Sequence, residues 1–249
     1  MKQRKTILFV ILSLLVAVLF FLDLTTGSVH ISIREIWGAL FGDGGDPTTI
    51  KIVRDIRLTK AIVAVAAGIS LSVSGLLMQT LFRNPLAGPY VLGISSGASL
   101  GVAIFILGAP LLGIVSSSAF SALGIAGAAW LGSALILIFL ASVIRRIKDI
   151  MVILILGMMF SSGVSAVVQI LQYLSNEEAL KSFVIWTMGS LGDVTVNELW
   201  LLVPAVIAGL LLAVSLLKQL NLLLLGENYA VTMGLNVRRS RYLIFLSTT

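Results

Sequence analysis

The sequence contains no cysteine, one histidine and few charged residues. Without cysteine the chain can form neither a disulfide nor a thiolate metal site, and His30 alone cannot complete a metal cluster. Charged residues make up 11% of the 249 residues, whereas soluble domains have about 25%. Because a soluble fold needs a polar surface over its core, this composition excludes an ordinary soluble domain.

The sequence contains long runs of apolar residues, and 58% of all residues are hydrophobic. The runs have roughly the twenty residues that a helix needs to cross about 30 Å of hydrocarbon. Strands of a membrane barrel would be about half as long and would alternate in polarity. We therefore predict an all-α membrane protein, a polytopic helical bundle in a single transmembrane domain over residues 1–249. The predicted spans are 7–22, 58–82, 91–108, 120–144, 150–174, 199–217 and 242 to the chain end.

The distribution of basic residues predicts the orientation of these spans. The first apolar run follows three basic residues, as in a signal peptide, but no small-x-small cleavage site comes after it, so we expect a retained helix. With the N-terminus in the cytoplasm, eleven basic residues fall on the inner side and six on the outer side, the sign that the positive-inside rule requires. The outer six are Arg34, Lys51, Arg54, Arg57, Lys60 and Lys181.

The residues give little support to catalysis. No G-x-x-x-x-G-K phosphate loop is present, so the chain does not hydrolyse ATP by that route, and no nucleophile has a plausible base. We therefore expect a chain that is not an enzyme and that binds no metal or cofactor. The spans also contain almost no charge, whereas ion-coupled transporters usually place ionisable residues in mid-membrane. Their most polar large side chains are Gln79, Gln169 and Gln172, for which the simplest interpretation is hydrogen bonding between helices.

Two groups of glycines mark further features. Gly93, Gly97 and Gly101 are four residues apart, with three serines among them, so they fall on one helix face. This pattern allows close helix packing, and it also suits small residues lining a weakly polar path. Gly226 and Gly234 bracket a polar stretch at the centre of residues 218–241. Residues 218–241 are too polar at their centre to span a membrane. We expect one or two short helices there, at the cytoplasmic surface.

Several motifs resemble one known family. Residues 57–101 contain RLTKA, GLLMQTLFRNPLAGP and VLGISSGASLG; residues 224–237 read LLGENYAVTMGLNV; and residues 186–192, WTMGSLG, are a weaker match. Together they closely resemble the permeases of bacterial iron-siderophore, haem and vitamin B12 ABC importers. The resemblance implies a permease subunit of the inner membrane that moves an iron chelate or cobalamin.

The resemblance also implies partners. It implies a second permease subunit, identical or different, two ATPase subunits that bind ATP and Mg, an extracytoplasmic solute-binding protein and surrounding lipid, with no nucleic acid. It makes residues 218–241 the segment that couples to the ATPase, and places Arg57 and Lys60 where the solute-binding protein docks. Within the coupling segment the implied contact residues are Gly226, Glu227, Ala230, Gly234 and Leu235. The residues expected to serve helix packing or to line the translocation path are Gln79, Asn84, Pro85, Gly93, Gly97 and Gly101.

The sequence departs from the family pattern in two ways. Thr59 stands where many relatives have proline. The family has about ten spans and a G-F-x-G-L-x-x-P-H motif in its last part, whereas this chain stops at Thr249 inside the seventh predicted span. We therefore expect a truncated or partial sequence. An ion-coupled secondary transporter and a non-transporting membrane scaffold stay open as alternatives, and the carried substrate is not indicated.

Overall fold

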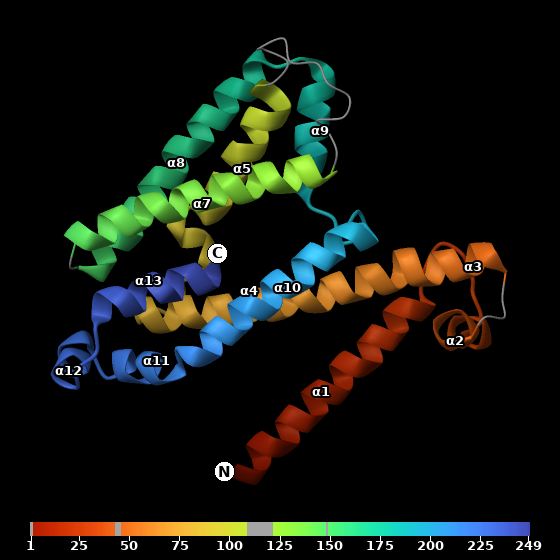
Figure 1. The fold of residues 1–249 in the computed structure, drawn as a ribbon, viewed down its shortest axis with the longest axis horizontal. Coiled ribbons are helices and arrows are strands. Elements are labelled where there is room, and N and C mark those ends of the chain that lie inside the picture. The colour runs from red at the N-terminus through yellow and green to blue at the C-terminus, as the bar shows by residue number, and fades with distance from the viewer. Residues whose placement is uncertain (1, 43–45, 109–121, 148) are drawn as a thin grey trace. The chain divides into compact units, whose positions relative to one another are not determined.

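The computed structural model describes residues 2–42, 46–108, 122–147 and 149–249, and every regular element in these ranges is a helix (Figure 1). The first two residues of the predicted 120–144 span lie outside them. The elements are α1 (Lys2–Thr25), α2 (Ile33–Phe41), α3 (Pro47–Lys51), η1 (Ile52–Leu58), α4 (Thr59–Phe82), η2 (Pro89–Leu92), α5 (Ile94–Ala103), η3 (Ile104–Gly108), α7 (Ala122–Arg146), α8 (Ile150–Leu174), α9 (Glu177–Met188), α10 (Val196–Ser215), α11 (Leu217–Leu224), α12 (Glu227–Thr232) and α13 (Val237–Thr248).

Five helices in the described part of the chain are long and apolar enough to cross a membrane. The other two predicted spans correspond to shorter helices: Ile94–Gly108 is apolar, and α13 has twelve residues and begins with three arginines in its first turns. The five long helices are Gln3–Thr25, Pro47–Phe82, Gly124–Ser142, Met151–Leu174 and Val196–Ser215.

The chain divides into two compact units, of which the first comprises Met1–Gly68 and Ser190–Pro204. Its small core joins α2 to the segment before α4, with Ile31, Ile36, Ala39 and Val53 buried together. A capping box starts α2, because Ser32 and Glu35 each bond the other's backbone N–H.

The C-terminal end of α1 is held by Arg57. The last carbonyls of a helix have no partner within the helix. The guanidinium of Arg57 supplies donors to the carbonyls of Leu24 at 2.8 Å, Thr25 at 3.2 Å and Val29. Only 6% of Arg57 is exposed, and a Cβ on Gly27 would lie 2.8 Å from its Nη2. Arg57 therefore joins the start of α4 to the end of α1.

Replacing Arg57 with methionine should loosen this end of α1. Three carbonyls would lose their donor, and an unsatisfied buried polar group costs about 1–3 kcal/mol. We expect faster amide hydrogen exchange after residue 24, measured by mass spectrometry in detergent. The control is Lys60→Met, which removes a half-exposed pair with Asp23 worth about 0–1 kcal/mol. Equal exchange in the two variants would contradict the anchoring role of Arg57.

The second unit comprises Ile69–Gly189 and Ala205–Thr249. In it α5 packs against α7 and α8 at backbone distance (Figure 1). A Cβ on Gly97 would lie 2.7 Å from the Gly132 carbonyl oxygen, and a Cβ on Gly101 would overlap the carbonyl of Ala128. Glycine is therefore required at both positions of α5, because any side chain would push the two helices apart.

A hydrophobic core in this unit surrounds the ends of α4 and α13. Phe82 and Phe245 are fully buried, with ring centroids 6.3 Å apart. Leu216 and Leu223 from the α10–α11 region belong to the same cluster. The hydroxyl of Ser247 donates to the Gly209 carbonyl at 2.9 Å, which ties α13 to α10. This core supports the short helices α11 and α12 from one side.

Candidate functional site

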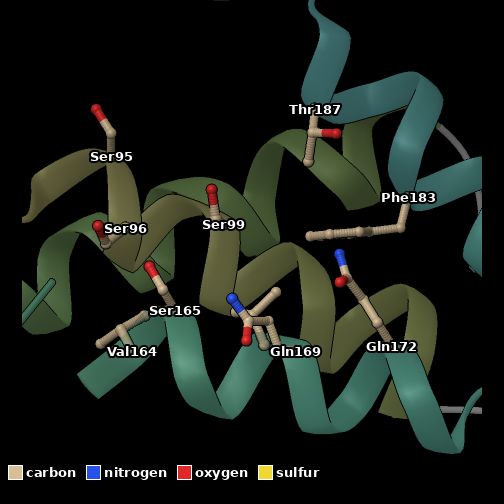
Figure 2. A pocket seen from close by; sticks show the side chains of 10 residues that line it. Ser95, Ser96, Ser99, Val164, Ser165, Gln169, Gln172, Phe183 and Thr187 are labelled. Carbon is tan, nitrogen blue, oxygen red and sulfur yellow. The ribbon is translucent and has the colours of Figure 1, made fainter. Parts of the chain in front are cut away.

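A polar pocket of about 330 Å³ lies between α5, α8 and α9 (Figure 2). Serines from α5 form one wall, and the side chains of Gln169 and Gln172 extend from α8 into the space. Phe183 and Thr187 from α9 close the end. The lining residues are Ser95, Ser96, Ser99, Val164, Ser165, Val168, Gln169, Gln172, Phe183 and Thr187.

Local sequence explains why α9 begins where it does. The Asn176 side chain accepts a hydrogen bond from the Ala179 N–H at 2.9 Å, and two glutamates occupy the first turn. Both features stabilise a helix N-terminus. Ala179 and Phe183 are then buried one turn apart against α8 and η3, which fixes the aromatic end of the pocket.

The pocket contains hydroxyl and amide groups but no charged side chain. Its hydroxyls partly bond their own helices, as Ser165 does to the Ser161 carbonyl at 2.9 Å and Thr187 to the Val184 carbonyl at 2.7 Å. Among the described residues, the side-chain amides of Gln169 and Gln172 have no hydrogen-bond partner. Each amide offers two donor hydrogens and one acceptor oxygen. The pocket can therefore hydrogen-bond a polar solute but cannot hold it by charge.

The glycine that precedes α5 and the two within it face neighbouring helices rather than this pocket. Gly93 has φ 77°, and a Cβ there would lie 2.8 Å from the Ser161 hydroxyl on α8. Gly97 and Gly101 contact α7 instead. The two interpretations of this stretch thus apply to different residues: the glycines pack helices, and the serines between them line the pocket.

The predicted residues at the end of α4 do not line the pocket. Gln79 is exposed on α4, and its carbonyl accepts from the Asn84 N–H at 3.1 Å. The Asn84 side chain accepts from the Leu86 N–H at 2.9 Å, forming a turn that contains the exposed Pro85. The role of Asn84 in this structure is to shape the chain between α4 and η2.

A second hollow, of about 470 Å³, lies at the opposite end of α4 from Thr59, where α4 meets α11 and α12. The Arg83 guanidinium donates to the Leu224 carbonyl at 2.9 Å, which joins α4 to the end of α11. We call this the α12 groove. Its lining residues are Leu81, Arg83, Leu223, Leu225, Gly226, Glu227, Asn228 and Tyr229.

Two glycines with positive φ delimit α12. Gly226 has φ 116° just before the helix, and Gly234 has φ 84° just after it. The Leu235 N–H donates to the Ala230 carbonyl and the Gly234 N–H to the Val231 carbonyl, both at 2.9 Å, the bonds of a Schellman cap. Ala230 is fully buried under the helix. The two sharp turns hold α12 as a short, separate helix.

An ion pair links α12 to α13. The Arg241 guanidinium donates to the Glu227 carboxylate, and its side chain is 3% exposed while that of Glu227 is 36% exposed. One face of Glu227 therefore remains accessible in the α12 groove, while the other fixes α12 against α13. Any force applied to α12 would reach α13 through this contact.

The two residues predicted to dock a solute-binding protein differ in accessibility. Lys60 has a 46% exposed side chain and pairs with Asp23 at 3.2 Å. Arg57 is buried among carbonyls, so a docking contact would require it to leave them. The docking role of both residues stays a prediction, and Lys60 could fill it without rearrangement.

The interpretation of the sequence missed α9 and with it Phe183 and Thr187. The signal was present, because Asn176 followed by two glutamates and an apolar run is a typical helix start. It also named Gln169 and Gln172 as polar without assigning them to the path. The periodicity of apolar residues along the sequence could not show that Gln169 and Gln172, and not Gln79, line the same pocket.

Comparison with known proteins identifies the family. The profile of the FecCD transport family matches residues 14–249. The chain belongs to the FecCD transport family. This FecCD chain is 35% identical over 229 residues to the hemin transport system permease protein of Yersinia pestis, covering 88% of the chain and 64% of the relative. It is 33% identical over 245 residues to the molybdate import system permease protein of Haemophilus influenzae, covering 95% and 69%.

A solved structure supports the same assignment. A chain described as an inward-facing, metal-chelate type ABC transporter matches with TM-score 0.81 and 29% identity, covering 98% of this FecCD chain and 73% of that chain. The predicted family resemblance and the all-α fold class are confirmed. FecCD membership and the five long apolar helices make it a multi-pass inner-membrane protein. The chain spans about two thirds of the length of the curated relatives it matches.

Proposed function

We propose that the chain is a membrane-spanning permease subunit of an ABC importer for an iron chelate, such as a siderophore or haem, or for cobalamin. The uncharged polar pocket between α5, α8 and α9 carries this proposal. Its amides and hydroxyls suit a solute with many hydrogen-bonding atoms. The resemblance to the FecCD family and the hemin permease among the relatives favour a chelate for this chain.

We propose that the energy comes from a partner. The chain would pair with a second permease, identical or different. Each permease would bind one of two ATPase subunits through its α12 groove on the cytoplasmic side, where the N-terminus would also lie. A solute-binding protein would dock outside near Lys60. No group of three or more His, Cys, Asp or Glu residues that could hold a metal is present in the described ranges.

Replacing both Gln169 and Gln172 with leucine should slow uptake about tenfold or more, since each lost hydrogen bond is worth about 0.5–1.5 kcal/mol. The assay is uptake of labelled iron-siderophore, haem or cobalamin into vesicles holding the permease with its ATPase and binding protein. Gln79→Leu is the matched control, because Gln79 is exposed outside the pocket. Equal uptake by the unmodified chain, the double variant and the Gln79→Leu control would contradict the proposal that the pocket belongs to the translocation path.

The same vesicles test the energy source. We expect uptake to need ATP and the ATPase subunit and to persist when an ionophore removes ion gradients. Uptake without the ATPase that stops on adding the ionophore would instead identify an ion-coupled transporter.

A further inference from the structure

The short helix α2 presents an apolar stripe to its surroundings. Ile33, Trp37 and Phe41 are 65%, 51% and 77% exposed and follow one another at four-residue spacing along one side of the helix. Ile36 and Ala39, on the neighbouring side, are buried in the core of the first unit. With nine residues, α2 is too short to cross a membrane. Its exposed stripe therefore needs another explanation.

The stripe is continuous with the surface of α1. The ring of Phe21, near the end of α1, stacks on Trp37 at 6.3 Å, and Trp37 stacks on Phe41 at 5.1 Å. Only 6% of the most apolar window of α1 is buried inside the protein. A long apolar helix with so little cover has a continuous apolar surface that lipid acyl chains can solvate. The row of three rings extends this apolar surface sideways onto α2.

The remaining side of α2 is charged. Arg34 and Glu35 are exposed there. The Glu35 carboxylate accepts hydrogen bonds from the Ser32 hydroxyl and N–H, both at 2.8 Å. The hydrogen bond from the hydroxyl, and to a smaller extent the one from the N–H, holds the pKa of Glu35 below its usual range. The carboxylate therefore stays charged. An apolar stripe bordered by charged residues is typical of helices that lie in the plane of a membrane surface.

We propose that α2 lies flat in the membrane interface at the end of α1, with Ile33, Trp37 and Phe41 inserted among phospholipid acyl chains. The apolar face of such a helix enters about 5–10 Å into the boundary between the headgroups and the acyl chains. Tryptophan prefers that depth, and Trp37 is at the centre of the stripe. This contact would fix the position of the segment that leads into α4, whatever solute the protein carries.

The test uses Trp37 as a depth probe in the full chain. Three of the four tryptophans, Trp130, Trp186 and Trp200, are replaced by phenylalanine, and the protein is reconstituted into phosphatidylcholine–phosphatidylglycerol vesicles. We expect bromine near the headgroup end of the acyl chains to quench Trp37 fluorescence more than bromine near the methyl end. Iodide in the water should quench it weakly.

Each other result would overturn the proposal. Strong iodide quenching without lipid quenching would place Trp37 in water, and quenching by neither agent would show that protein covers the stripe. A second variant, Ile33→Asn with Phe41→Asn, leaves Trp37 in place and should shift its quenching from lipid towards iodide. Folding of each protein is checked by circular dichroism, and an unchanged quenching pattern in this variant would also count against lipid contact.

Discussion

Replacing Gly101 with valine is expected to separate α5 from α7 and to abolish uptake. A Cβ at this position already overlaps the backbone of Ala128, and backbone cannot move aside as a flexible side chain can. Overpacking costs about 1–3 kcal/mol, and a backbone collision should reach at least the top of that range. For a chain of this size, such a loss lowers Tm by about 5–10 °C. Circular dichroism in detergent measures it.

The matched control is Gly127→Ala on the facing helix. A Cβ on Gly127 would meet nothing within 4 Å, and alanine is the better helix former. Its Tm and its uptake should equal those of the unmodified chain. If Gly101→Val were as stable as Gly127→Ala, the close approach of α5 and α7 would be wrong.

Replacing Glu227 with alanine is expected to stop uptake while ATP hydrolysis by the partner continues. The substitution removes the carboxylate from the buried guanidinium of Arg241 and weakens the link between α12 and α13. A fully buried pair costs about 3–5 kcal/mol to break, and the partial exposure of Glu227 reduces this figure. The measurement compares ATP hydrolysis and solute uptake in the same reconstituted vesicles.

A second variant separates two explanations of that result. If Glu227 acts by linking α12 to α13, Arg241→Ala should give the same loss of uptake, and exchange of the two charges should restore part of it. If Glu227 acts only by touching the ATPase, Arg241→Ala should leave uptake unchanged. Normal uptake in both single variants would contradict any coupling role for this segment.

The glycine spacing of α5 shows what sequence could predict. Glycines four residues apart on an apolar run indicate close packing whatever the neighbour is, because the missing side chains leave room on one face. The same reasoning could not name Gly132 and Ala128 as the neighbours, since helix pairing depends on contacts distant in sequence. The serines between the glycines were assigned no direction, and their pocket required α8 and α9 to be placed.

The contacts of Arg57 could not be predicted from the sequence. The family resemblance implied a docking role for Arg57, which stays a prediction; the structure adds that its guanidinium completes the end of α1, more than thirty residues earlier. No local pattern indicates that pairing, because it depends on how the chain turns back between α1 and α4. The α12 segment was easier, since Gly226 and Gly234 mark its ends directly through the backbone conformations that only glycine adopts readily.

The absence of ionisable side chains from the lining of the α5–α8–α9 pocket has an electrical consequence. Moving one elementary charge through a membrane potential of 100 mV involves about 2.3 kcal/mol. A wall of serine, glutamine, threonine, valine and phenylalanine contributes no mobile charge of its own, and no lining group changes its charge between acidic and alkaline conditions. If the solute passes along this pocket, the electrical work done there depends on the net charge of the solute alone, so a neutral chelate would pass the pocket without electrical work.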